Sequence, residues 1–280
     1  CAVILLPRQF HISIVENTNP NHIVKAMWLF PLYMLVINIF VLPIALAGIM
    51  QLGTVKPDNF VLDLPLLHHQ YLLSLLVVIG GFSAAASMVI VETTALSIMV
   101  SNHLIMPLLI TSLARRDSDV SNSARWIIQI RRISIIAILF LAYLYVYIIA
   151  SNRELVSIGL VSFTAVSQFA PSVFGGMFWK GATKSGAIWG LVVGFVIWAI
   201  SLPIPTLAEQ NVLNPYFIEN GYFGISWLKP YNLFGLEGFD HISHAAFWSL
   251  ILNTATYIGV SLNTTQSPME ITQADYFVNI

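Results

Sequence analysis

The chain has 280 residues, of which 57% are hydrophobic and only 9% are charged, and its formal net charge is −1. Soluble domains average about 25% charged residues, so this composition excludes an ordinary soluble domain and predicts an integral membrane protein whose main partner is the lipid bilayer, with no nucleic acid. The single cysteine, Cys1, excludes an intrachain disulfide and a cysteine-based zinc site.

The apolar stretches predict six membrane-spanning helices separated by polar connections. Residues 7–22 are polar and punctuated by proline, which predicts a loop. Residues 51–70 predict a loop with a short surface helix, and residues 203–244 predict a long loop. Because the chain opens inside an apolar run, we expect it to be a piece of a longer protein. A span needs about 20 residues, and we expect the six spans at about 26–50, 71–107, 133–150, 155–178, 187–202 and 245–262.

Basic residues are distributed unevenly between the two sets of connections. Three of the twelve lie in one set, at Lys56, Arg153 and Lys229. The positive-inside rule places the more basic connections in the cytoplasm, so it predicts that both ends of the chain are cytoplasmic. The other set contains nine, namely Arg8, Lys25, Arg115, Arg116, Arg125, Arg131, Arg132, Lys180 and Lys184.

The second expected span carries a carboxylate near its middle. An unpaired acid at this depth costs on the order of 3 kcal/mol, and intramembrane acids usually face a partner, a cavity or an ion path. At 100° per residue Ser83 and Ser87 lie close to one face, and Glu92 is one turn from Met88. The hydroxyls either line an ion path with Glu92 or only bond their own helix backbone. With no Lys or Arg inside any span, we expect Glu92 to be protonated when the site is empty.

The fourth span also contains polar residues, among them Ser167 and Gln168, which are the candidate substrate-binding residues. Gln168 comes three residues before Pro171. Its amide can hydrogen-bond a substrate or fill the carbonyl gap that a proline leaves in a helix, and both alternatives remain open. The loop histidines, including His68 and His241, have only loose metal-ligand spacing, so no metal site is predicted. We find no catalytic motif and expect no enzyme active site in these residues.

Several segments resemble the sodium/solute symporter family. They are LPRQFHISIV at 6–15, SAAASMVIVETTALSIMVSNHL at 83–104 and VSFTAVSQFAPSVFGGMFWKGATKSGAIWGLVVG at 161–194. The resemblance implies an all-α membrane fold, namely the later half of a LeuT-type inverted-repeat transporter. It also implies a small-molecule solute and a coupling ion, Na⁺ or H⁺.

Two further segments resemble the symporter-like membrane domain of bacterial sensor histidine kinases. They are FGISWLKPYNLFGLEGFDHISHAAFWSLILN at 223–253 and PMEITQADYFVNI at 268–280. The resemblance implies a symporter-like transmembrane domain at 1–266 and the start of a cytoplasmic connector at 267–280. It further implies a bacterial inner membrane, a downstream kinase that uses ATP, and a response regulator as partner.

The symporter pattern is altered at one ion-binding position. In that family two adjacent hydroxyls contribute to a second sodium site, and they align with Ser87 and Met88. Met88 offers only a soft thioether, a poor ligand for a hard cation. Glu92 can compensate as an ion ligand or as a proton carrier, with Ser87 and Ser83 as its neighbours. We therefore expect proton coupling at Glu92 more than sodium coupling.

Three functions are consistent with these features. The leading hypothesis is the membrane input domain of a sensor histidine kinase that binds, and still transports, a small solute such as an amino acid. The alternative is a stand-alone sodium- or proton-coupled solute symporter. The third is a structural membrane anchor, which predicts that Ser87, Glu92 and Gln168 are all replaceable without effect.

Overall fold

The computed structural model describes residues 2–53, 56–108, 120–150, 155–210, 212–236 and 238–278, and every regular element in these residues is helical. Arg115, Arg116 and Arg153, which the orientation prediction uses, lie outside the described residues. The all-α prediction and the number of candidate spans are confirmed. By length and composition, six helical segments can cross a membrane: Asn21–Leu52, Tyr71–Leu108, Trp126–Ile148, Leu155–Phe178, Lys184–Glu209 and His241–Asn263.

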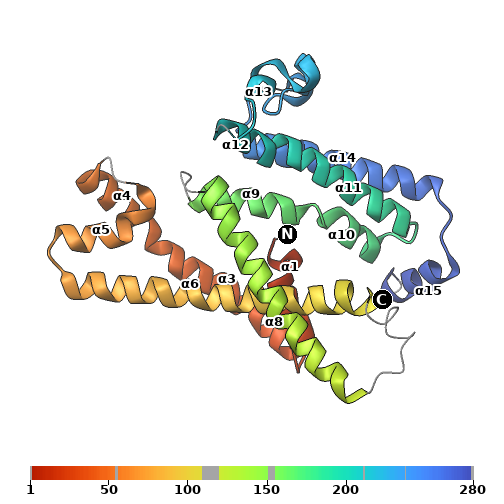
Figure 1. Cartoon of the computed structure of the whole chain (residues 1–280), viewed down its shortest axis with the longest axis horizontal. Coiled ribbons are helices and arrows are strands. Elements are labelled where there is room, and N and C mark those ends of the chain that lie inside the picture. Colours follow the sequence, from red (N-terminus) through yellow and green to blue (C-terminus); the bar gives the residue numbers. More distant parts are fainter. Residues whose placement is uncertain are drawn as a thin grey trace. The chain divides into compact units, whose positions relative to one another are not determined.

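Contacts divide the chain into two compact units, and the first unit is Pro7–Tyr145. In it α5 packs against both α4 and α6, while α2 and α8 pack against α6, the long helix in Figure 1. Its helices are α2 (Pro7–Phe10), the π-helix η1 (His11–Val15), α3 (Asn21–Ile39), α4 (Val41–Leu52), the 3₁₀-helix η2 (Pro57–Asn59), α5 (Phe60–Leu67), α6 (Tyr71–Met99), the π-helix η3 (Val100–Ile105) and α8 (Val120–Tyr145).

The first unit corrects three predictions. Much of the expected loop at 7–22 is helical, in α2 and η1. The expected first span is two helices, α3 and α4, which meet at Phe40. Pro43 explains this break, because a proline has no N–H to donate to the carbonyl four residues earlier, here that of Ile39. The third candidate span begins at Trp126, earlier than expected, within α8, which itself begins at Val120. The short helix expected within 51–70 is present as α5.

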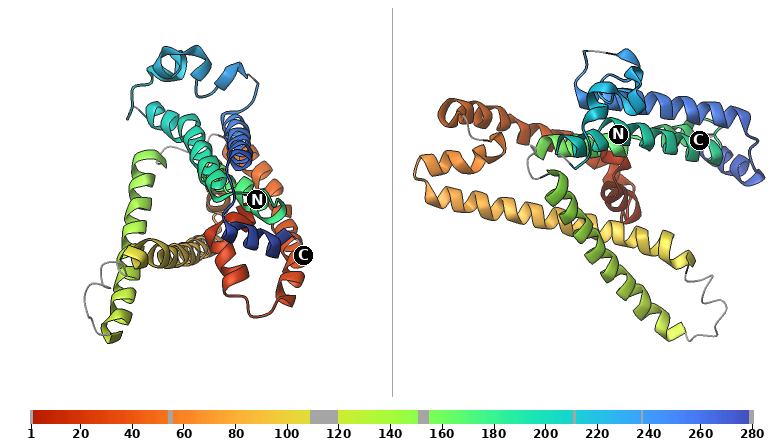
Figure 2. Two further views of the ribbon diagram at one scale, coloured as in Figure 1. Left: turned by 90° about the vertical axis from the view of Figure 1, so that its right-hand side faces the viewer. Right: turned by 45° about the horizontal axis from the view of Figure 1, so that its top comes forward.

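The second unit is Cys1–Leu6 together with Val146–Ile280. Its central pair, α11 and α14, lie side by side in all views (Figures 1 and 2). Its helices are α1 (Ala2–Leu5), the π-helix η4 (Val146–Ala150), α9 (Leu155–Ser167), α10 (Ala170–Phe178), α11 (Lys184–Ser201), α12 (Pro203–Glu209), α13 (Tyr216–Asn220), the 3₁₀-helices η5 (Tyr222–Gly224), η6 (Ser226–Leu228) and η7 (Leu233–Gly235), α14 (His241–Asn263) and α15 (Pro268–Val278).

Side chains cap the amino-terminal ends of both central helices. Thr183 accepts a hydrogen bond from the Gly186 backbone N–H at 3.1 Å at the start of α11. Asp240 accepts from the N–H groups of Ile242 and Ser243, each at 3.2 Å, at the start of α14. These caps satisfy backbone donors that a helix leaves unpaired and define where the two helices begin.

Three glycines let α11 approach α14 closely. Gly186, Gly190 and Gly194 are four residues apart and therefore share one face of α11. A Cβ atom at Gly194 would lie 2.5 Å from Gln168 Oε1 and 2.6 Å from Asn253 Nδ2. Small residues at such positions are how membrane helices gain close packing without a hydrophobic driving force between them.

We expect Gly194→Ala to destabilise this helix pair, because the added methyl group has no space. Overpacking of this kind costs about 1–3 kcal/mol, which a melting curve of the detergent-solubilised protein detects as a lowered Tm. Gly259→Ala on α14 is the matched control, since a Cβ atom added there would have nothing within 4 Å of it. Equal melting temperatures for the two variants would contradict the close contact described here.

Candidate functional site

The hydroxyls of α6 bond mainly to their own helix. The Ser87 hydroxyl donates to the Ala84 carbonyl at 2.9 Å, and Thr94 donates to the Ile90 carbonyl at 2.7 Å. Ser83 and Ser87 are both exposed. The structure therefore supports the simpler alternative for these hydroxyls, and it does not gather Ser83 and Ser87 into a cavity with Glu92. Their role in ion binding stays a prediction.

Glu92 has a basic partner that the sequence did not reveal. Arg8 in α2 brings its Nε atom to 3.5 Å from Glu92 Oε2, and the two side chains are 17% and 30% exposed. The expectation of a protonated Glu92 did not include this partner, which lies in α2 and not in a candidate span, and the protonation of Glu92 stays a prediction. A partly buried charge is less costly when an opposite charge is beside it. Any proton or sodium ion that binds Glu92 has to compete with Arg8.

The fourth span is broken at Gln168 and Phe169, between α9 and α10. The backbone N–H of Gln168 bonds the Ala165 carbonyl at 3.1 Å instead of the carbonyl one residue earlier. The Thr164 carbonyl is instead bonded by side chains, accepting from Ser167 Oγ at 2.7 Å and from Gln168 Nε2 at 3.2 Å. Gln168 thus fills a carbonyl gap at the break, but this gap is at Thr164 and not at Ser167, the residue whose carbonyl Pro171 leaves without its usual donor.

Gln168 also joins α14 in a buried polar cluster. Its Nε2 donates to Ser249 Oγ at 2.8 Å, and Asn253 Nδ2 donates to the Gln168 carbonyl at 2.8 Å and to its Oε1 at 3.2 Å. All three residues are 0% exposed. Within the described part of the chain, Asn253 Oδ1 is buried and has no hydrogen-bond partner. Ser249 and Asn253 are four residues apart and so share one face of α14, a spacing from which the pair could have been found in the sequence.

The two residues predicted to bind substrate therefore adjoin the same break. Ser167 and Gln168 both bond the Thr164 carbonyl, and Gln168 also bonds Ser249 of α14. In this arrangement the Gln168 amide is occupied by protein groups, so a solute has to replace one of them. Their role in substrate binding stays a prediction.

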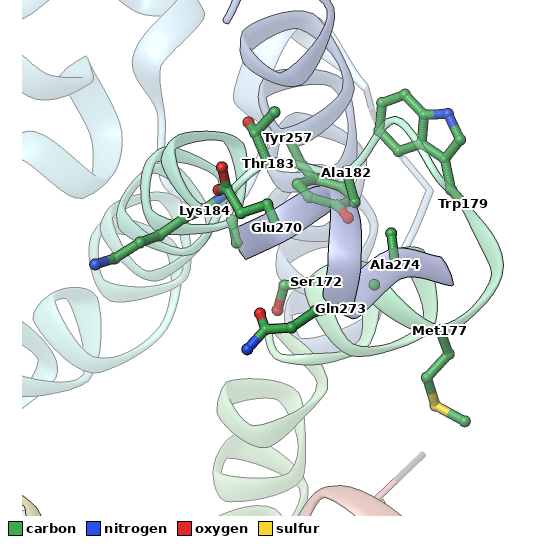
Figure 3. A pocket seen from close by; sticks show the side chains of 12 residues that line it. Ser172, Met177, Trp179, Ala182, Thr183, Lys184, Tyr257, Glu270, Gln273 and Ala274 are labelled. Carbon is green, nitrogen blue, oxygen red and sulfur yellow. The ribbon is translucent and has the colours of Figure 1, made fainter. Parts of the chain in front are cut away.

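A cavity of about 350 Å³ lies at the other end of α10 (Figure 3). Its walls come from α10, the turn that follows it, the first residues of α11, α14 and α15, and they include the rings of Trp179 and Tyr257. Ser172 and Gln273 contribute polar groups to the lining. Thr183, Lys184 and Glu270 also line the cavity, and the amino group of Lys184 points away from the other labelled side chains in Figure 3. None of the residues predicted to bind ion or substrate lines this cavity.

Among the described residues no group of three or more histidine, cysteine, aspartate or glutamate side chains is placed to hold a metal ion. His68 bonds Gln51 Oε1 at 2.7 Å, and the ring of His241 lies against that of Tyr231 with 3.8 Å between centroids.

No protein-family model, curated protein or solved structure matches this chain. The candidate sites therefore depend on their own geometry and on the sequence segments described above.

We expect Arg8 and Glu92 to be energetically coupled. Replacing either with glutamine leaves the other charge partly buried and unpaired. The losses of unfolding free energy in the two single variants should therefore add up to more than the loss in the double variant. The coupling energy of contacting residues is about 0.5–3 kcal/mol. It is measured by a double-mutant cycle on detergent-solubilised protein.

The matched control for this cycle is Glu16→Gln. Glu16 pairs with His11 at 3.2 Å, but its side chain is 63% exposed. We expect a change within about 0.5 kcal/mol, as for most surface substitutions. Strictly additive effects of the Arg8 and Glu92 variants would show that the contact carries no coupling.

Proposed function

We propose that this chain is the symporter-like membrane input domain of a bacterial sensor histidine kinase, which binds and transports a small solute such as an amino acid. The observation that carries the proposal is the broken span α9–α10, whose break contains the buried cluster of Gln168, Ser249 and Asn253. Discontinuous helices form the substrate sites of many secondary transporters. In the proposal, the chain forms the later half of a LeuT-type inverted repeat.

The break supplies groups that suit a small polar solute. Ser167 and Gln168 offer a hydroxyl and a carboxamide, and Asn253 Oδ1 is a buried acceptor with no partner among the described residues. Because a buried unpaired acceptor costs about 1–3 kcal/mol, a solute N–H that bonds it gains that energy. The proposed solute displaces Ser249 from the Gln168 amide and takes its place.

Coupling is proposed at Glu92. A proton or Na⁺ that binds the carboxylate releases Arg8, so the ion pair provides two alternative arrangements of α2 and α6. Ser83 and Ser87 are proposed neighbours of the ion, and Met88 disfavours sodium because its thioether is a soft ligand. We therefore propose H⁺ before Na⁺ as the coupling ion.

The signalling part of the proposal lies beyond these residues. A kinase that uses ATP and passes its phosphoryl group to a response regulator is the proposed continuation after the connector at 267–280. The helix α15, which begins at Pro268 and is separated from the last candidate span by residues 264–267, supports the proposal because it offers a helical start for such a connector.

A stand-alone sodium- or proton-coupled symporter is the second candidate. The Arg8–Glu92 pair suits this candidate as well, because both candidates transport a solute with ion coupling. The two candidates differ in whether solute binding changes the phosphorylation of the same polypeptide.

The proposal is tested on the full-length protein in sealed membrane vesicles with a panel of radiolabelled amino acids. We expect at least one of them to accumulate under an imposed pH gradient and to change autophosphorylation from labelled ATP. Glu92→Gln, which mimics the protonated state, should still bind that amino acid but lose uphill accumulation. Ser87→Ala should reduce accumulation less.

Two results would reject parts of this function. Accumulation without any phosphorylation would favour the stand-alone symporter. Accumulation that follows a sodium gradient and ignores a pH gradient, or a Glu92→Gln protein that still concentrates the amino acid, would remove proton coupling at Glu92.

The proposed location is the bacterial inner membrane with both ends of the chain in the cytoplasm. The uneven distribution of Lys and Arg between the connections supports it. A cysteine placed within 205–240 should react with an impermeant thiol reagent from the periplasm, whereas one within 117–124 should react only from the cytoplasm. The reverse pattern would contradict this orientation and the cytoplasmic connector.

A further inference from the structure

The segment after α14 folds back onto the turn between α10 and α11. We call residues 264–278 the exit segment. The hydroxyls of Thr264 and Thr183 lie 2.9 Å apart, and Gln266 Nε2 donates to the Ala182 carbonyl at 2.8 Å and also to the Lys180 carbonyl. The exit segment is therefore bonded along the turn that connects α10 to α11.

Glu270 joins two helix ends with one carboxylate. Its Oε2 accepts from the Ser267 backbone N–H at 2.6 Å, and the Ser267 hydroxyl accepts from the Glu270 N–H at 3.3 Å. This reciprocal pair is a capping box at the start of α15. Oε1 accepts from the Lys184 backbone N–H at 2.7 Å, at the first residue of α11. Each carboxylate oxygen thus serves a different helix.

The charge of Glu270 suits this position. The amino-terminal ends of α11 and α15 both carry partial positive charge and would repel each other if brought together alone. A carboxylate between them offsets the repulsion. Hydrogen bonds from the backbone N–H groups of Ser267 and Lys184 hold the pKa of Glu270 below its ordinary value, so the group stays ionised at neutral pH.

The packing of α15 connects this contact to the broken span. It lies against α10, the helix that begins directly after the break at Gln168 and Phe169. The cavity described above lies between α15 and its neighbours, so α15 is incompletely packed there (Figure 3). Few apolar contacts and solvent-exposed hydrogen bonds are typical of elements that open at low free energy.

We propose that Glu270 is a latch that holds the exit segment to the start of α11, and that movement of α10 relative to α11 releases it. The latch has two states, with Glu270 bonded to both helices or to α15 alone. The consequence for signalling rests on the proposed function, whereas the existence of the latch does not.

Three substitutions separate the latch from simpler effects. Glu270→Gln replaces one acceptor oxygen by an amide group that only donates, so it cannot accept from Ser267 and Lys184 through two separate oxygens as Glu270 does. Ser267→Ala removes the capping hydroxyl of α15 and leaves both Glu270 acceptors. Asp275→Asn removes the same charge from the same helix, where Asp275 pairs with Lys180 at 3.5 Å and both side chains are more than half exposed. Such surface pairs contribute little to stability.

The test places spin labels at Trp189 on α11 and Tyr276 on α15, both exposed, in the full-length protein with its native cysteines replaced. We expect double electron–electron resonance to give one distance between the two spin labels for the unsubstituted protein, for Ser267→Ala and for Asp275→Asn. Glu270→Gln should add a longer distance as a major component. An unchanged distribution of label-to-label distances for Glu270→Gln would overturn the latch. The same longer distance in Ser267→Ala or in Asp275→Asn would also overturn it.

A second measurement separates the latch from the kinase hypothesis. We expect Glu270→Gln to change basal autophosphorylation by about fivefold or more, the lower end of ordinary allosteric coupling. Release of α15 in a protein without autophosphorylation would support the latch and reject the proposed function. Amino-acid-dependent autophosphorylation with no release in Glu270→Gln would reject the latch and leave the proposed function in place.

Discussion

The close approach of α11 and α14 is the constraint on which the second unit depends. Lipid tails are as apolar as leucine, so two membrane helices gain little by burying apolar side chains against each other and associate through packing and hydrogen bonds. The face of Gly190 and Gly194 gives Asn253 the room to reach Gln168. The same glycine face continues to Gly186, where Thr183 and Ser261 mark the end of the pair from which the exit segment leaves.

The sequence predicted the features that depend on hydropathy. The hydrocarbon core of a bilayer holds no water that could hydrogen-bond backbone N–H and C=O groups. A span must therefore be a continuous helix, or a broken helix whose unpaired backbone groups find other partners. The length of an apolar stretch is enough to identify such a span. Pro171 allowed two roles for Gln168, and its side chain has a third one, since it bonds the carbonyl of Thr164 and not that of Ser167. The loop expected at 7–22 was wrong for residues 7–15, which form α2 and η1, and α2 packs on α6.

Features that join distant parts of the chain were not predictable. Arg8 reaches Glu92 from 84 positions away in the sequence, and Lys184 reaches Glu270 from 86 positions away. No periodicity relates such pairs, because only the packing of separate helices determines which side chains meet. Both pairs involve a carboxylate whose role changes once its partner is known. Glu92 becomes half of an ion pair, and Glu270 becomes a cap shared by two helices.

The break between α9 and α10 has a consequence for how the protein is assembled. The Thr164 carbonyl is satisfied by Ser167 and Gln168, residues of the same span, before any contact with α14 is needed. Membrane helices are thought of as inserting individually and packing afterwards. The bend can therefore form as soon as residues 155–178 enter the bilayer, and α14, which is synthesised later, meets a Gln168 amide already positioned for Ser249 and Asn253. The order of synthesis thus agrees with the local hydrogen bonding, and the break between α9 and α10 presents a preformed contact surface to α14.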